Sequence, residues 1–356
     1  MKQKKHHWGL IICAVAFLVM LLYLFVGGEA QMLGEALVGF KIEYLFIIFA
    51  LMAVNWGMEA ISIHWLTKQV YSAQRLGHTV TTTMIGQYYN CITPLSSGGQ
   101  PMQAYYMAKF GTPPSVSMSV LLVRMIVYQI SLMLYSAFVL VCKLGYFFTE
   151  QHGVLVYLAI IGFAMNLVGV TFFFMIGFWK KGTMRAVHGV IRLLAKIRII
   201  KKKDETIANT DRQLEEAYEN MRFVFRHPGP IIGSIGLTLI QLTAFFSISY
   251  FIYLGFVSAP TTDYLTVMGS QSMVCMVSSM FPLPGAIGLT ETSYVVFFKD
   301  IYPVARYADI SMVFWRLLTF YAAIVIGIVI TVVLDRRFAR AERAAHKNEE
   351  QEEKEE

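Results

Sequence analysis

The sequence has little charge. Only 15% of its 356 residues are Asp, Glu, Lys or Arg, while 56% are hydrophobic. A soluble domain has about 25% charged and roughly 45–50% apolar residues. The composition therefore argues against a soluble enzyme. It predicts a membrane protein whose length is used for spanning helices of about 20 residues each.

Cysteine is also scarce, and the common enzyme motifs are missing. The four cysteines are far apart in apolar surroundings, with no C-x-x-C or Cys/His spacing, so neither a zinc site nor a disulfide framework is predicted. The sequence has no G-x-S-x-G, H-E-x-x-H or P-loop motif. We therefore expect no catalytic residue, no metal and no cofactor. The basic residues lie beside apolar runs, which argues against nucleic-acid binding.

Long apolar runs are abundant, and six of them are long enough to cross a hydrocarbon core of about 30 Å. These predicted spans are 8–27, 43–66, 115–142, 154–179, 229–257 and 309–334. The first resembles a signal peptide, but its apolar run is longer than an h-region of roughly 7–15 residues. We therefore expect an uncleaved spanning helix there.

Two further apolar stretches, 79–110 and 264–299, are interrupted by proline and glycine. The first break has the sequence TPLSSGGQP and the second FPLPGAIG. Non-helical backbone at membrane depth is tolerated only where it is buried in protein or lines a wet cavity. We therefore expect both breaks to face an interior cavity.

The lysines and arginines predict the orientation, because cytoplasmic loops carry an excess of them. They place both chain ends and the segment 180–227 in the cytoplasm. The crossings then balance only if each broken stretch is re-entrant, or crosses twice as two short halves. The same order of elements, a span, a broken hairpin and a second span, occurs over 43–142 and again over 229–334. The two copies have opposite orientations, as in inverted-repeat transporters. The predicted fold is thus all-α and polytopic, with about six full spans and two re-entrant hairpins, or about eight helices if these cross.

Two segments lie outside the predicted spans. The segment 180–227 alternates basic and apolar residues, which suits an amphipathic helix on an anionic inner leaflet. Ordinary positive-inside charge explains this segment equally well. The residues 336–356 are highly charged and predict a solvated, disordered cytoplasmic tail. The rest of the chain, 1–335, is predicted to be one transmembrane domain.

Each break offers a candidate anion site. A glycine-rich turn that leads into a helix N-terminus can bind an anion, and a lipid phosphate is the natural anion in a membrane. A tight re-entrant turn needs glycine and proline in any case, so spacing alone does not decide. Glu291 falls in the first turn after the second break. Its carboxylate either stabilises the helix dipole by about 0.3–1 kcal/mol or pairs with a lipid amine or a proton.

Arg124 and Arg316 each lie inside the full span that follows a break. Both are about 10–14 Å deep at 1.5 Å per residue, where snorkelling to the interface is strained. Arginine is the preferred planar donor to phosphate. We therefore hypothesise that the two arginines approach the membrane midplane from opposite leaflets and hand a headgroup phosphate across.

Other polar residues at membrane depth complete the candidate site. Most are predicted to form hydrogen bonds between helices; they include Glu59, His64, Gln87, Gln241 and Gln271. Those near the first break are better placed to line a cavity. The predicted headgroup and cavity residues are Asn90, Thr93, Pro94, Gly98, Gly99, Gln100, Gln103, Arg124, Gln129, Pro282, Pro284, Gly285, Gly288, Glu291 and Arg316.

These same residues resemble a known family over roughly residues 8–334. The first half of the lysylphosphatidylglycerol synthase transmembrane-region family is similar to Gly86-x-x-x-Asn90-x-x-Thr93-Pro94-x-x-x-Gly98-Gly99-Gln100-Pro101, followed by Arg124 and Tyr128-Gln129. The second half is similar to Pro282-x-Pro284-Gly285-x-x-Gly288-x-x-Glu291, followed by Arg316-Leu317-Leu318-Thr319-x-Tyr321.

The resemblance implies a flippase-like domain, as at the N-terminus of the multiple peptide resistance factor. That domain is thought to move aminoacylated phosphatidylglycerol to the outer leaflet. The resemblance thus implies a phospholipid ligand, a bacterial-type plasma membrane and a link to cationic peptide resistance. It leaves open a homo-oligomer, or a separate lipid-modifying enzyme, as partner.

The sequence departs from the family pattern in two ways. Many members have Arg where this chain has Gln103, and Glu-Arg where it has Val123-Arg124, which leaves the headgroup open. The best-known member also continues into a cytosolic acyltransferase-like domain, whereas this sequence ends at Glu356. We therefore do not expect the chain to aminoacylate a lipid by itself. Two alternatives stay open: a phosphatidylglycerol lysyltransferase or a subunit of lysylphosphatidylglycerol synthesis, and a non-transporting membrane scaffold.

Overall fold

The computed structural model is helical, with no strand in the residues it describes. These are residues 11, 13–15, 34, 39–148, 153–196, 203–279 and 281–355. The predicted first span, 8–27, lies largely outside this set.

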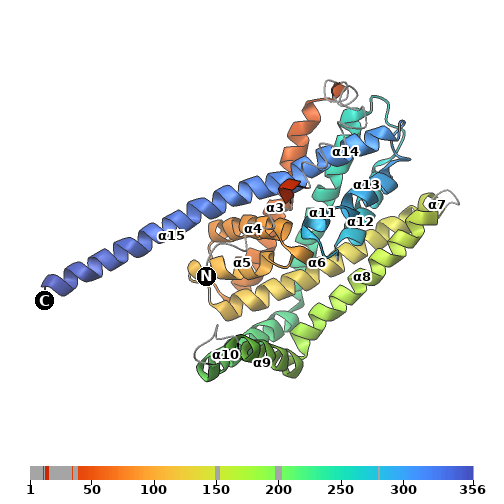
Figure 1. The fold of residues 1–356 in the computed structure, drawn as a ribbon. Helices are drawn as coiled ribbons and strands as arrows, with labels where there is room; N and C mark the ends of the chain where they lie inside the picture. Colours follow the sequence, from red (N-terminus) through yellow and green to blue (C-terminus); the bar gives the residue numbers. More distant parts are fainter. Residues whose placement is uncertain are drawn as a thin grey trace.

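Five of the described helices are long and apolar enough to cross a membrane. They are α3 (Glu43–Val70), α6 (Pro114–Cys142), α8 (Gly153–Phe178), α11 (Pro228–Phe256) and the continuous helix through α14 (Arg306–Arg316), η5 (Leu317–Tyr321) and α15 (Ala322–Glu355). They coincide with five of the six predicted spans, which confirms the all-α polytopic membrane fold (Figure 1).

Local sequence signals set where several helices begin. Pro114 is the first residue of α6, and Pro228 is the first residue of α11. Proline suits this position because its missing N–H would have no helical partner there. Asp263 precedes α12 (Tyr264–Ser278), and its carboxylate accepts a hydrogen bond from the Thr266 backbone N–H at 3.2 Å. This side chain caps the helix.

Both broken stretches form re-entrant hairpins. The first consists of α4 (Leu76–Ile92), the turn η2 (Pro94–Ser96) and α5 (Gly99–Lys109). The second consists of α12, the turn η4 (Pro284–Ala286) and α13 (Leu289–Phe298).

Contacts between the two ends of each hairpin show that both ends lie on the same side of the bundle. In the first, the rings of His78 and Phe110 stack with their centroids 4.2 Å apart. In the second, the Thr262 hydroxyl donates to the Ile301 carbonyl at 3.3 Å. Each hairpin therefore enters and leaves on one side, as both predicted alternatives require.

The turns of the two hairpins share an unusual backbone. Directly after a proline, Leu95 and Ser96 have φ of 54° and 51°, and Gly285 and Ala286 have φ of 58° and 50°. Residues other than glycine rarely adopt this left-handed conformation. The turns η2 and η4 also lie against each other, so the two breaks meet inside the bundle.

Corresponding elements of the two halves exchange contacts. The helices α3 and α11 pack along each other in opposite directions: the Lys41 N–H donates to the Gly255 carbonyl at one end, and the Trp65 indole donates to the Pro230 carbonyl at the other. The helix α4 packs on α15, and α12 packs on α6. In Figure 1, α6 rises toward α7 (Leu144–Phe147), whereas α14 and α15 run the other way. These contacts are those expected of an inverted repeat.

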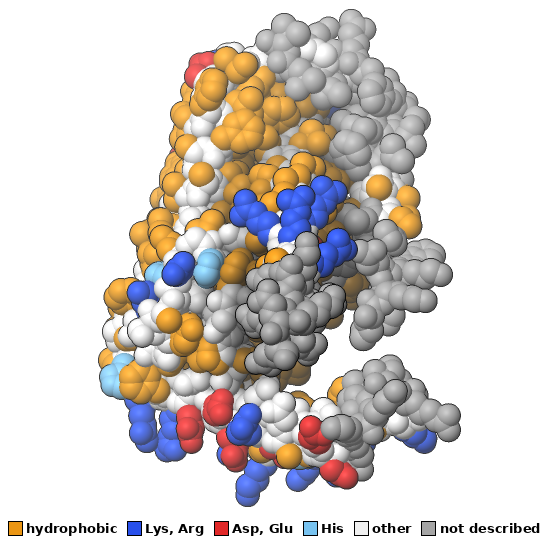
Figure 2. Space-filling view, turned by 90° about the vertical axis from the view of Figure 1, so that its left-hand side faces the viewer, with side chains coloured by type: hydrophobic (Ala, Val, Ile, Leu, Met, Phe, Trp, Pro, Cys, Tyr) orange, Lys and Arg blue, Asp and Glu red, His pale blue; other side chains and the backbone are white. Residues whose placement is uncertain are grey.

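The segment 180–227 contains two helices rather than the single amphipathic helix suggested by its sequence. They are α9 (Lys180–Lys196) and α10 (Lys203–Arg226), and they lie together at one end of the bundle (Figure 1). The helix α10 packs on α6 and α11. In the face shown in Figure 2, hydrophobic side chains predominate in the coloured upper part, a group of Lys and Arg lies near the middle, and many charged side chains lie along the bottom edge.

The predicted disordered tail is wrong in one respect, because α15 continues as one helix to Glu355. Its last part is rich in Ala, Glu, Lys and Arg, which are strong helix formers. Extending an existing helix also avoids the unfavourable nucleation step. The prediction failed because it considered the tail separately from the span that precedes it.

Candidate functional site

A cavity of about 400 Å³ lies at the meeting point of the two breaks. Its polar lining residues are Asn55, Glu59, Gln87, Asn90, Ser96, Gln100, Gln103, Arg124, Tyr128, Gln129, Gln241, Ser278, Ser279, Thr290 and Arg316. Leu95 and Leu283, one from each break, also line it and are 51% and 45% exposed. The cavity therefore reaches the protein surface beside the breaks.

Arg124 lies on α6, about 15 Å along the helix from its first residue at 1.5 Å per residue. Its side chain is only 6% exposed. The Nη2 atom donates to the Gln241 side-chain oxygen, whereas Nε and Nη1 have no hydrogen-bond partner among the described residues. A buried donor without a partner is costly. The guanidinium lies beside the cavity, and two of its nitrogens have no hydrogen-bond partner among the described residues.

Glu59 supplies the negative charge nearest to this arginine. Its Oε2 accepts hydrogen bonds from the Gln241 amide at 3.2 Å and from the Gln87 amide. Gln241 therefore bridges Glu59 and Arg124, with its oxygen toward the cation and its nitrogen toward the carboxylate. This arrangement balances the charge without a direct ion pair.

Glu59, Gln87 and Gln241 were predicted only as interhelical hydrogen-bond partners. They do join α3, α4 and α11 in this way, but they also line the cavity. The signal that could have identified Glu59 is its depth: it lies about 24 Å into α3 at 1.5 Å per residue. An ionisable group there is a candidate functional residue by default.

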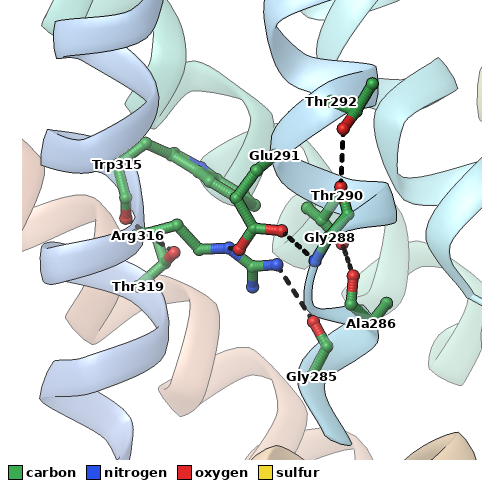
Figure 3. Close-up of polar contacts among 9 residues, drawn as sticks. All are labelled: Gly285, Ala286, Gly288, Thr290, Glu291, Thr292, Trp315, Arg316 and Thr319. Carbon is green, nitrogen blue, oxygen red and sulfur yellow. Dashed lines mark hydrogen bonds and ion pairs between the residues drawn. The ribbon is translucent and has the colours of Figure 1, made fainter. Parts of the chain in front are cut away.

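Arg316 is equally buried, at 4% exposed, but its contacts differ (Figure 3). Its Nε lies 2.7 Å from Oε1 of Glu291, and its Nη2 donates to the Gly285 carbonyl at 3.0 Å. The other carboxylate oxygen of Glu291 accepts from the Gly288 N–H at 2.7 Å. Arg316 therefore ties its own helix to the second break.

Packing explains the glycines of the first break without a ligand. The Thr93 hydroxyl accepts from the Gly98 N–H at 2.9 Å, so that donor is already used. A Cβ on Gly99 would come within 2.0 Å of the Asn90 side-chain oxygen. Packing within the turn thus accounts for both glycines, and a role of this turn in anion binding stays a prediction.

The predicted residues divide into two groups. Those that line the cavity are Asn90, Gln100, Gln103, Arg124, Gln129, Gly285 and Arg316. Those in or beside the breaks, outside the lining, are Thr93, Pro94, Gly98, Gly99, Pro282, Pro284, Gly288 and Glu291. Within the described part of the chain, no three His, Cys, Asp or Glu side chains are placed to hold a metal ion. A role of either group in binding stays a prediction.

Comparisons with known proteins agree with this architecture. The family described as "Lysylphosphatidylglycerol synthase TM region" matches residues 9–327. A "UPF0104 membrane protein" of Archaeoglobus fulgidus is 22% identical over 286 residues, which cover 80% of this chain and 84% of that protein. The matched family region includes both breaks and both buried arginines.

Proposed function

Because the chain belongs to the lysylphosphatidylglycerol synthase transmembrane-region family, we propose that it binds a phospholipid headgroup in the central cavity and moves the lipid between leaflets. The observation that carries the proposal is Arg124, a buried guanidinium that lines the cavity and has two nitrogens without a hydrogen-bond partner among the described residues. Such a group can donate to two oxygens of one phosphate.

The size and position of the cavity support a headgroup as its occupant. Its volume, about 400 Å³, falls within the range of roughly 300–1,000 Å³ typical of small-molecule pockets. The opening is flanked by Leu95 and Leu283, which are exposed and apolar. A lipid would place its polar head against Arg124 and leave its acyl chains outside, beside these leucines.

Two acceptors in the cavity favour a headgroup that also carries donors. The side-chain oxygens of Asn90 and Gln129 are buried and have no hydrogen-bond partner among the described residues. Hydroxyl groups of a glycerol headgroup, or an amine, would satisfy them. In its narrower form, the proposal is that the bound lipid is an aminoacylated phosphatidylglycerol. A role in cationic peptide resistance would require this lipid.

The two arginines then have different roles, unlike in the symmetric hand-over expected at first. Arg124 binds the phosphate. Arg316 is held by Glu291 and the Gly285 carbonyl, and it positions the second break. The two halves therefore contribute chemically different arginines to the cavity wall, although their helices correspond.

A reconstitution assay tests the proposal. The full chain is incorporated into vesicles that contain a trace of fluorescently labelled phosphatidylglycerol, and lipid movement is followed by chemical quenching from outside. We expect the wild type to accelerate movement, Arg124→Gln to lose at least about tenfold, and Arg222→Gln, an exposed position on α10, to keep wild-type activity. The tenfold figure corresponds to one charged hydrogen bond of about 1.5 kcal/mol.

The controls separate binding from folding. Thermal unfolding in detergent checks that Arg124→Gln is folded, and vesicle flotation checks that it is inserted. Undiminished lipid movement by a folded Arg124→Gln protein would overturn the proposal. Lysyl transfer from charged tRNA by the wild-type chain, without lipid movement, would favour synthesis instead.

A further inference from the structure

The helix α9 differs in charge from α10, the helix that packs against it. It carries several lysines and arginines but no acidic residue, whereas α10 has six Asp and Glu among its charged residues. Two contacts fix α9 against α10: Lys180 pairs with Glu215 at 2.8 Å, and His188 pairs with Asp211 at 2.6 Å. These contacts determine which face of α9 points outward.

The outward face carries a basic stripe. Lys181, Arg185, Arg192 and Lys196 are exposed and lie at helical spacing on one side. No ion pair to Lys181, Arg185 or Arg192 is found in the part of the chain that the structure describes. Gly189 lies in the middle of the stripe. Together with the neighbouring residues it forms a shallow concave surface between Arg185 and Arg192.

An apolar stripe runs beside the basic one. Val190 and Leu193 on α9 are 56% and 60% exposed. Phe178 and Trp179, where the α8 span meets α9, are 56% and 55% exposed. Exposed aromatics at a helix end are typical of the membrane–water interface. An amphipathic helix of this composition lies in that interface with its basic residues at headgroup level.

We propose that α9 is a binding site for anionic phospholipids of the leaflet it lies on, separate from the central cavity. A headgroup phosphate occupies the concave surface at Gly189, between Arg185 and Arg192, and the acyl chains run beside Val190 and Leu193. A Cβ on Gly189 would meet nothing within 4 Å, so the surface is open to a ligand. The site gives the protein a dependence on membrane charge.

Native mass spectrometry of the full chain in detergent tests this site directly. Phosphatidylglycerol and phosphatidylcholine with identical acyl chains are added in equal amounts, and bound lipids are counted. We expect a preference for phosphatidylglycerol in the wild type. We expect K181Q/R185Q/R192Q to lower that preference at least about fivefold, which is the effect of one basic residue near an anionic surface.

Matched variants separate this site from general charge and from the cavity. R212Q/R222Q/R226Q removes three exposed positive charges from α10 and should keep the wild-type preference. Arg124→Gln should lose the one lipid bound in the central cavity, and the preference that remains should still fall when K181Q/R185Q/R192Q is added. Gly189→Glu places a negative charge on the concave surface without a steric clash and should reduce the preference while the protein stays folded.

Three results would overturn the proposal. The first is a wild-type protein without preference for phosphatidylglycerol. The second is an unchanged preference in K181Q/R185Q/R192Q or in Gly189→Glu. The third is an equal loss in the α10 triple variant, which would reduce the role of α9 to ordinary positive charge.

Discussion

The two buried arginines occupy corresponding places in the two halves of the molecule, but their contacts differ. Arg316 pairs directly with Glu291 and also donates to the Gly285 carbonyl. Arg124 has one hydrogen bond, to Gln241, and two of its nitrogens have no partner among the described residues. The two halves therefore share their helix packing, but only the first half has an arginine with donor nitrogens that lack a partner.

A single position in the sequence accounts for much of this difference. Counted from the proline that begins each turn, the position of Glu291 is occupied by Pro101 in the first half. Proline has no charge to offer Arg124. The negative charge near Arg124 comes instead from Glu59 on α3, through the amide of Gln241.

The largest expected effect concerns the second half, where Glu291→Gln leaves Arg316 buried without its counter-charge. Breaking a buried pair by removing one partner costs about 3–5 kcal/mol, so we expect a large fall in the thermal stability of the detergent-solubilised protein. Arg124→Gln should lower stability less, because it removes one hydrogen bond, to Gln241, and leaves Glu59 with its hydrogen bonds from Gln87 and Gln241. Equal losses of stability in the two variants would contradict the difference between the halves.

The turns themselves give the second prediction, because Leu95 and Gly285 share the same backbone conformation. A Cβ on Gly285 would come within 2.1 Å of the Phe320 ring. We expect Gly285→Leu to destabilise the protein by several kcal/mol; overpacking typically costs about 1–3 kcal/mol, and the left-handed conformation adds about 1–2 kcal/mol.

The matched change, Leu95→Gly, relieves strain of about 1–2 kcal/mol at an exposed site. Thermal unfolding should therefore show little loss, or a small gain. If Leu95→Gly were as damaging as Gly285→Leu, the Leu95 side chain would be needed for packing at the first break.

A smaller effect is expected from Glu59→Gln, which keeps the hydrogen bonds of the cavity but removes its negative charge. The cavity then becomes more positive around Arg124. We expect tighter binding of phosphatidylglycerol by at least about fivefold, because a charge pair roughly 4 Å apart is worth about 1 kcal/mol even in bulk water. Lipid titration monitored by thermal shift measures the change. Weaker binding of phosphatidylglycerol would place the headgroup elsewhere.

The smallest expected effect is a dependence of stability on pH, caused by Asp263 before α12. Burial alone would raise the pKa of Asp263, but hydrogen bonds from Lys143 and Thr266 outweigh it and hold that pKa below its usual value of 3.8. The stability from this carboxylate is thus fully present above about pH 4 and is lost as the pH falls below 3.8. The side chain is half exposed, so solvent screening keeps the effect small.

A comparison with Asp263→Asn isolates this contribution. The stability difference between wild type and variant should shrink as the pH is lowered from 5 toward 3, a window set by the unperturbed aspartate value of about 3.9. A difference that stays constant over this range would mean that the Lys143 contact contributes nothing.

Much of the architecture could be predicted from the sequence. Apolar length located the spans, and the prolines and glycines located both breaks, since each of these signals acts within a few residues. The depth of Arg124 and Arg316 followed in the same way, because depth along a helix depends only on residue count.

The partners of these arginines could not be predicted, because they depend on which faces of distant helices meet. Nothing in the spacing shows that Gln241 would contact Arg124 while Glu291 contacts Arg316. The left-handed conformation of Leu95 also left no signal, since leucine rarely adopts it. The turn lies against η4, which is far away in the sequence.

The structure of the chain with phosphatidylglycerol in a lipid nanodisc tests the central claim most directly. The account predicts a phosphate oxygen within about 3 Å of Nε or Nη1 of Arg124, an intact Glu291–Arg316 pair, and acyl chains leaving beside Leu95 and Leu283. A phosphate bound at Arg316 with that pair broken, or a cavity without lipid at saturating phosphatidylglycerol, would contradict it.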